Sequence, residues 1–197
     1  MKKVFRHIKT KIFYLYHFLL LKFFNVHIKK MPVISGLLYI RGRGVISIGN
    51  NVKITSSIYT NPVGLSHKTL FFVSKNAYLR IGNEVGISNS LLFAKIGIEI
   101  EDKVMIGGGC QILDSDFHPL DPVDRNDLKS LEKINSKPIL VKRGAFIGAN
   151  SIILKGVTIG ENSIIGAGSV LRVNVPDNEI WAGNPAVYVG SIENTKH

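Results

Sequence analysis

The sequence predicts an all-β solenoid in which short strands coil around one apolar core. Two series of residues, each with a period of six, run through its C-terminal half. That period fits neither the 3.6-residue repeat of a helix nor the two-residue alternation of a hairpin strand. The first series is aliphatic (Val141, Ile147, Ile153, Ile159, Ile165 and Leu171), and the second, four positions later, is small or β-branched (Ala145, Ser151, Val157, Ser163, Ser169 and Val175).

Each six-residue unit is interpreted as one short strand and one turn. The aliphatic residue points into the core, and the small residue fits where the turn narrows. Three units close a triangular coil of about 18 residues, and successive coils stack as parallel strands. Residues 141–176 therefore make two uninterrupted coils. The same register recurs earlier in the chain, at Ile48, Ile54, Ile81, Ile87, Ile100, Ile106 and Ile112.

The register breaks once on this interpretation, between Ile112 and Val141. We therefore predict a β-helix over residues 31–176 with one long inserted loop, residues 113–140. A long excursion from a compact domain is usually functional or disordered. Residues 1–30 are predicted to form a separate helical segment, and residues 177–197 a short C-terminal tail.

Composition fits one folded domain, because the 197 residues are 45% hydrophobic and 20% charged. The single cysteine, Cys110, excludes an intrachain disulfide framework and a zinc ribbon. The net charge of +11 is uneven. Residues 1–83 hold 14 Lys and Arg and no acidic residue, whereas the remainder has a net charge of −3. One end of the protein is therefore expected to meet an anionic surface.

The N-terminal segment combines basic residues with an apolar helical face. Phe5, Ile8, Ile12, Leu15 and Leu19 are spaced 3, 4, 3 and 4 residues apart. The apolar run is too short for a membrane span and lacks a signal-peptidase site. Two interpretations remain open: a helix in the interface of an anionic membrane, or a helix packed on the body or on a neighbouring subunit. No nucleic-acid motif accompanies the basic residues, so we expect no nucleic-acid partner.

Three motifs give the sequence a family resemblance. They are Asp-Ser-Asp-Phe-His-Pro-Leu-Asp-Pro (114–122), Ile-Gly-Ala-Gly-Ser-Val (165–170) and Trp-Ala-Gly-Asn-Pro-Ala (181–186). Together with the repeat, they resemble the hexapeptide-repeat acyltransferases. The nearest likeness is to the sugar O-acetyltransferases of surface polysaccharide synthesis and to the maltose and galactoside acetyltransferases. The resemblance implies a left-handed parallel β-helix, a hand that the sequence itself does not predict.

Acyl transfer to a hydroxyl requires a base, and histidine suits that role near neutral pH. The resemblance assigns His118 as the general base. Asp114 and Asp116 flank it, and either could orient the imidazole, bind acceptor hydroxyls, or hold the loop through bonds to the backbone. We favour Asp116 for the functional role. Asn89 aligns with an acceptor-binding asparagine of the galactoside enzymes.

The resemblance places the donor, acetyl-coenzyme A, against two glycine-alanine corners, with Phe146 lining the site. The pantetheine arm would bond to the backbone at these corners, and an N–H near Ala149 could stabilise an oxyanion. Positions 187 and 190 are Val and Gly, where the galactoside enzymes carry arginines for coenzyme phosphates. Arg172 is the expected substitute, and Lys142, Arg143 and Lys155 are further candidates. The corners are Gly148-Ala149 and Gly166-Ala167.

The sequence therefore predicts an acetyl-coenzyme A-dependent O-acetyltransferase without a metal. The acceptor would be a saccharide hydroxyl on a cell-surface polysaccharide or its lipid-linked precursor. The resemblance implies a homotrimer with sites at subunit interfaces. We expect the protein in the cytoplasm, and on the membrane interpretation its basic, apolar N-terminus would hold it in peripheral contact with the inner face of the cell membrane. The alternatives are an N-acyltransferase acting on an amino sugar or amine, and a non-catalytic β-helix. A carbonic anhydrase is disfavoured, since only His67 and His118 lie between residues 28 and 196.

Overall fold

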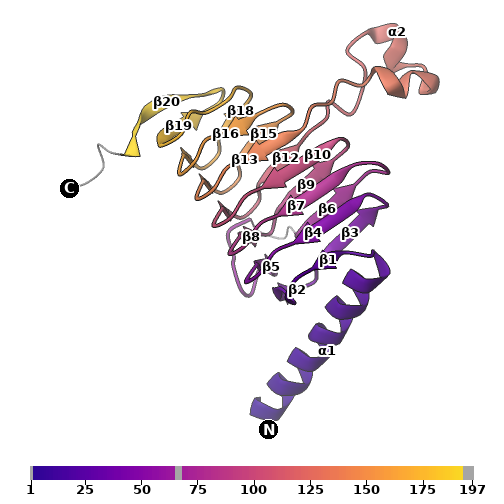
Figure 1. Cartoon of the computed structure of the whole chain (residues 1–197), viewed down its shortest axis with the longest axis vertical. Coiled ribbons are helices and arrows are strands. Elements are labelled where there is room, and N and C mark those ends of the chain that lie inside the picture. The colour runs from indigo at the N-terminus through magenta and orange to yellow at the C-terminus, as the bar shows by residue number, and fades with distance from the viewer. Residues whose placement is uncertain (1, 65–67, 193–197) are drawn as a thin grey trace.

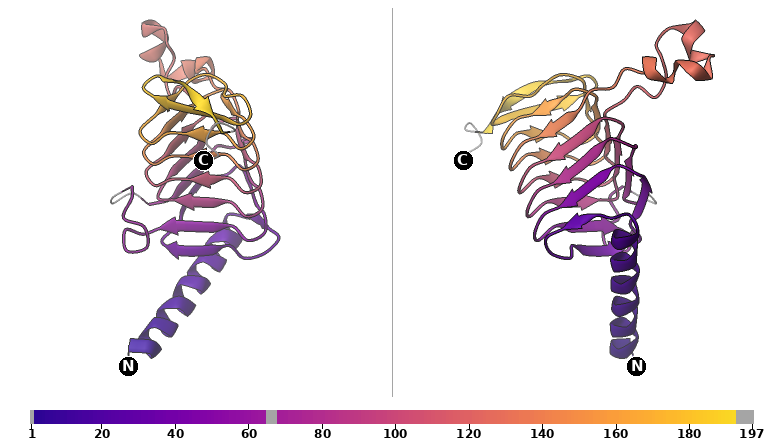
Figure 2. Two further views of the ribbon diagram at one scale, coloured as in Figure 1. Left: turned by 90° about the vertical axis from the view of Figure 1, so that its left-hand side faces the viewer. Right: turned by 45° about the vertical axis from the view of Figure 1, so that its right-hand side comes forward.

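The protein folds as a left-handed parallel β-helix of triangular cross-section, as the resemblance implied. The computed structural model describes residues 2–64 and 68–192. Three sheets form the sides of the prism, and every strand pair is parallel except the last, β19 with β20. The chain passes from the first sheet to the second, then to the third, and back to the first (Figures 1 and 2).

The strands of each sheet are short. The first sheet contains β1 (His27–Ile28), β4 (Val45–Ile48), β7 (Tyr78–Ile81), β10 (Gly97–Ile100), β13 (Ile139–Val141) and β16 (Thr158–Ile159). The second contains β2 (Val33–Gly36), β5 (Lys53–Ser56), β8 (Gly86–Ser88), β11 (Met105–Ile106), β14 (Phe146–Ile147), β17 (Ile164–Ile165), β19 (Glu179–Gly183) and β20 (Ala186–Ser191). The third contains β3 (Tyr39–Gly42), β6 (Leu70–Val73), β9 (Leu91–Ala94), β12 (Gln111–Leu113), β15 (Ile152–Leu154) and β18 (Val170–Leu171).

The six-residue register is confirmed in the two uninterrupted coils. Ile147 pairs with Ile165, and Ile153 pairs with Leu171, so one coil takes 18 residues. Both six-residue series point inward, and all of their members are buried. The core is a single column of stacked aliphatic side chains, and Cys110 is buried within it.

The expectation of a single break in the register is wrong. A second excursion leaves the β-helix between the end of β5 and the start of β6. Its described part, residues 57–64, lies against Gly108 and Gly109. A Cβ on Gly108 would stand 2.1 Å from the Val63 carbonyl oxygen, so only glycine admits this close approach. The sequence shows the glycines but not the segment that packs on them.

Two segments project from the prism (Figures 1 and 2). Helix α1 (Lys2–Phe23) extends from the end at which the β-helix begins. The longer excursion forms an arm with α2 (Pro122–Arg125) and the 3-10 helix η1 (Leu128–Lys133). Its two strands are held together at the prism, where Ser115 pairs antiparallel with Ser136 and Lys137 N–H donates to Asp114 O. The described C-terminal residues form the β19–β20 hairpin.

Candidate active site

His118 lies on the arm just beyond the end of β12, and its side chain is exposed. Its neighbours fix the chain on both sides. Phe117 has a φ of 67°, and its ring packs 4.6 Å from Phe93, which itself stacks on Phe72. Pro119 is buried. The imidazole is thus an exposed group on an anchored backbone, which is what a base that receives a proton from a bound substrate requires.

Asp116 projects next to this anchor and pairs with a lysine from the following coil. Lys155 Nζ donates to Asp116 Oδ1 at 2.5 Å, and each side chain is 23% exposed. Nothing among the described residues donates to the other oxygen, Asp116 Oδ2, although that atom is buried. One carboxylate oxygen is therefore held by Lys155, and the other is buried without a donor among the described residues. Lys155, a candidate for the coenzyme phosphates on sequence grounds, therefore pairs with Asp116 instead.

Asp114 has a different environment, since it is fully buried. Its carboxylate accepts three backbone N–H groups, from Lys95, Ile96 and Gly97, each at 2.7 Å. Burial raises the pKa of the Asp114 carboxyl, and the N–H donors act in the opposite sense. Of the roles that the sequence left open, this geometry favours a structural one. The carboxylate holds the turn between β9 and β10 next to the arm.

Asn89 is also fully buried, with a φ of 42°. Its side-chain amide donates to Asn61 O at 2.9 Å and to Val63 O at 3.1 Å, so it fastens the 57–64 excursion to the prism. Asn89 Oδ1 has no partner among the described residues. The structure therefore gives Asn89 a clear structural contact and leaves one acceptor atom free.

The expected donor corners form a stacked column between the second and third sheets. Gly148 N–H donates to Ile165 O at 2.7 Å, and a Cβ on Gly148 would stand 2.5 Å from Ala167 N. A Cβ on Gly166 would similarly meet the Ala182 side chain at 2.8 Å. Within the described part of the chain, the N–H groups of Ala149 and Ala167 donate to no acceptor. Free N–H groups along a glycine-lined column fit the amide-bearing arm that the resemblance predicts.

Two further predicted residues lie on the outer surface. Phe146 is exposed on β14 beside the exposed Met105 of β11, which makes an apolar stripe leading to the Gly148 corner. Arg172 is exposed after β18 and forms no ion pair with any residue that the structure describes. Lys142 and Lys155, in contrast, are already paired with Asp177 and Asp116.

The predicted residues fall on two different edges of one prism. The turns that leave the second sheet form one edge, which carries Asn89, Gly148, Ala149, Gly166 and Ala167. The turns that leave the third sheet form another edge, which carries Asp114, Asp116, His118, Lys155 and Arg172. One chain therefore does not bring its His118 to its own Ala149 column.

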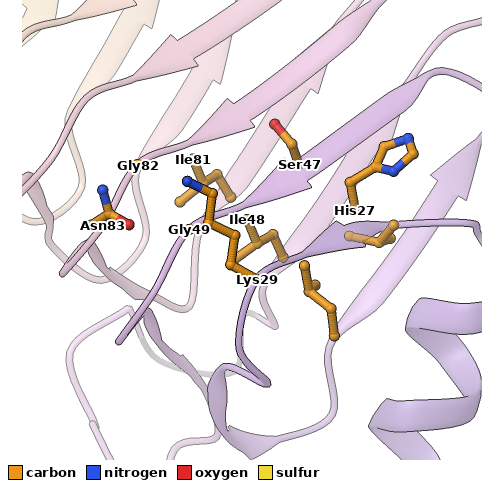
Figure 3. A pocket seen from close by; sticks show the side chains of 10 residues that line it. His27, Lys29, Ser47, Ile48, Gly49, Ile81, Gly82 and Asn83 are labelled. Atoms are coloured by element: carbon orange, nitrogen blue, oxygen red, sulfur yellow. The ribbon is translucent and has the colours of Figure 1, made fainter.

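A separate hollow lies on the first sheet near α1 (Figure 3). It is lined by residues of β1, β4 and β7 and of the turns that follow them, including His27, Lys29, Ser47 and Asn83. None of the predicted site residues lines it. No group of three or more His, Cys, Asp or Glu side chains in the described ranges is arranged to hold a metal ion, and His67 lies outside those ranges.

Comparison with known proteins agrees with this structure. The family model for the bacterial transferase hexapeptide (six repeats) matches residues 138–172. The galactoside O-acetyltransferase of Lactococcus lactis is 30% identical over 140 residues, which are 71% of this chain and 60% of that protein.

Among solved structures, a maltose O-acetyltransferase from Clostridium difficile superposes with a TM-score of 0.53 at 26% identity, covering 85% of this chain and 69% of that one. A point mutant of AntD, an N-acyltransferase from Bacillus cereus in complex with dTDP and coenzyme A, superposes with a TM-score of 0.60 at 24% identity, covering 84% and 82%.

The chain carries the repeat of the bacterial transferase hexapeptide family over residues 138–172, and its left-handed β-helix is the fold that the resemblance implied. The chain spans less than two thirds of the length of the curated relatives that it matches.

Proposed function

We propose that this protein is an acetyl-coenzyme A-dependent O-acetyltransferase. Its acceptor would be a sugar hydroxyl of a cell-surface polysaccharide or of the lipid-linked precursor. The observation that carries the proposal is the exposed His118 on a backbone anchored by Phe117 and Pro119. Similarity to galactoside and maltose O-acetyltransferases supports transfer to oxygen.

The proposed reaction is a direct transfer. The donor supplies an acetyl thioester. His118 takes the proton from the acceptor hydroxyl as its oxygen forms a bond to the acetyl carbon. The bond from that carbon to sulfur breaks, and the proton passes to the departing thiolate. Asp116, fixed by Lys155, presents its free Oδ2 either to the imidazole N–H or to an acceptor hydroxyl. A free backbone N–H, such as that of Ala149, can stabilise the negative charge that develops on the acetyl oxygen.

The assembly in this proposal is a homotrimer. His118 and the Ala149 column lie on different edges of one prism, so a complete site needs the edge of a second copy. Three prisms with parallel axes would form three equivalent sites, each with a base from one subunit and a donor groove from the next. The exposed Phe146 and Met105 would be covered at these seams.

The test of the proposal is the His118→Ala variant. We expect its turnover, followed as thiol release from acetyl-coenzyme A with a panel of sugars, to fall by at least about 100-fold. Its circular dichroism should match that of the wild type, because the side chain is exposed. The control is His27→Ala, which removes an exposed histidine on β1, distant in sequence from His118. This variant should retain activity. Turnover in His118→Ala close to that of the wild type would refute the assignment.

The second candidate is N-acyl transfer, since the AntD structure shares the fold and is an N-acyltransferase. The product separates the two functions, because mild base hydrolyses an ester and leaves an amide intact. A third candidate is a non-catalytic β-helix module, which failure of the wild-type protein to bind acetyl-coenzyme A in calorimetry would favour.

The proposed location is the cytoplasm, with peripheral attachment to the inner face of the cell membrane. None of the helices in the described ranges is long and apolar enough to span a bilayer. The absence of acidic residues before Glu84 supports contact with an anionic surface.

A further inference from the structure

Helix α1 is attached to the β-helix through one side only. His17 and Leu21 are each 2% exposed, and Tyr16 OH donates to Leu38 O at 3.2 Å. Leu20 and Phe24 pack partly against the same core. These contacts use the second half of the helix, which leaves the first half extending beyond the prism (Figures 1 and 2).

The opposite side of α1 carries an unpartnered apolar row, which we call the outer stripe: Ile12, Leu15, Leu19 and Phe23. Their exposed fractions are 62%, 56%, 54% and 82%. Their spacing of 3, 4 and 4 residues places them on one face, above one another. The first three belong to the apolar face that the sequence predicted, whereas the side chains of Phe5 and Ile8 lie outside the described part. The structure shows that this face points away from the body, whose contacts are made by His17 and Leu21 instead.

The charges around the outer stripe indicate what can cover it. Helix α1 contains six Lys and Arg and no acidic residue. The first coils of the β-helix, next to the helix, add exposed basic residues, and again no carboxylate precedes Glu84. These exposed residues are Lys29, Lys30, Arg41, Arg43 and Lys53.

A second copy of α1 is a poor match for this surface. It would bring another six basic residues and no acidic partner, so the helices would repel one another. An anionic lipid leaflet offers both requirements at once. Its acyl boundary accepts apolar side chains to a depth of about 5–10 Å, and its headgroups attract lysine and arginine.

We propose that the outer stripe of α1 is a lipid-binding face, which lies in the interface of an anionic membrane and holds the β-helix at its surface. The contact with the prism through His17 and Leu21 fixes the helix, so that the outer stripe is presented away from the body. This proposal specifies the peripheral attachment given in the proposed function. It rests on the enzyme function for one point only, namely that the acceptor would be found at the membrane.

The experiment is vesicle flotation of the full-length protein. Vesicles of phosphatidylcholine alone are compared with vesicles containing phosphatidylglycerol. The test variant is Ile12→Ser/Leu15→Ser/Leu19→Ser, which keeps every basic residue. The control is Val187→Ser/Val189→Ser on β20, which removes two exposed valines at the other end of the chain. Circular dichroism confirms that each variant is folded.

We expect the wild type and the control to float with the anionic vesicles and to lose much of this binding in roughly 0.5 M salt. The triple variant should bind at least about tenfold more weakly. Equal flotation of the triple variant and the wild type would overturn the proposal, and so would failure of the wild type to float. A wild-type oligomer that dissociates in the triple variant, without any flotation, would show that a second copy covers the stripe.

Activity in solution distinguishes this proposal from the proposed function. The triple variant should transfer acetyl groups to a soluble acceptor at the wild-type rate, because the outer stripe is absent from the site. A protein that floats but does not transfer acetyl groups would leave the lipid-binding face standing and remove the enzyme function.

Discussion

The environment of Asp114 gives a sharp test of which aspartate is structural and which is functional. Its carboxylate is buried and accepts three N–H groups of the turn between β9 and β10, each at 2.7 Å. Asp114→Ala leaves all three donors without this acceptor. Gly97 N–H is fully buried, whereas the Lys95 and Ile96 bonds are partly exposed, so water can replace those two more easily.

The size of the effect follows from that difference in burial. A buried donor left unsatisfied costs about 1–3 kcal/mol, and each partly exposed bond contributes about 1 kcal/mol. We therefore expect Asp114→Ala to lower the free energy of unfolding by about 4 kcal/mol. In a chain of this size, that is a fall of about 10 °C in Tm. Asp114→Asn keeps one oxygen and should lose roughly half as much.

The assay combines thermal unfolding with turnover per folded molecule. Asp114→Ala should be much less stable, but its folded fraction at low temperature should keep its turnover. Asp116→Asn should show the reverse pattern, with little change in Tm and a large loss of turnover. If Asp114→Ala melts within about 2 °C of the wild type and yet loses most of its turnover, then Asp114 acts on the acceptor and the reasoning is wrong.

Two further predictions concern Lys155 and His17. Lys155→Met should lower kcat by about tenfold in the thiol-release assay, because Asp116 loses the partner that fixes Oδ1. Lys155→Arg should restore most of the lost kcat. An unchanged kcat in Lys155→Met would contradict the role of this ion pair. Burial lowers the pKa of His17, so the unfolded chain binds this proton more readily than the folded one. Stability should therefore fall as the pH drops below about 6.5, and thermal melts of His17→Leu on either side of that pH should show a smaller difference than those of the wild type.

The sequence predicted the regular part of the fold well, for a physical reason. The inward aliphatic and small residues repeat every six positions. Because the core requires such a residue at each inward position, its period is visible in the sequence. The 57–64 excursion carries no such period. Its position is set by contacts with distant residues, such as the amide of Asn89 and the Cβ-free backbone of Gly108. The identity of a glycine or an asparagine in the sequence does not predict which distant residue it contacts.

The candidate site rests on both the sequence and the structure. The resemblance assigned His118 as the base, which remains a prediction, and the structure shows how Phe117 and the Phe93 ring anchor the backbone beside it. The sequence analysis favoured Asp116 over Asp114 without a physical ground, because two aspartates two residues apart differ only in burial and contacts, which the fold decides. Lys155 was overlooked as a partner of Asp116, since the two residues are 39 positions apart and meet only through the stacking of coils.

The regularity of the β-helix explains why its functional groups lie where the repeat fails. Inside a coil, the inward side chains fill the core. The backbone N–H and C=O groups of each strand pair with the neighbouring coils, so few of these polar groups remain without a partner. A free imidazole requires the chain to leave the prism, which it does at the arm that carries His118. A lipid-binding face requires an element with a second apolar side, which α1 supplies before the first coil begins. The proposed donor column differs, because it lies on the prism itself and not on a projecting segment. Its free N–H groups lie at the turns, where the strand pairing of each sheet is interrupted.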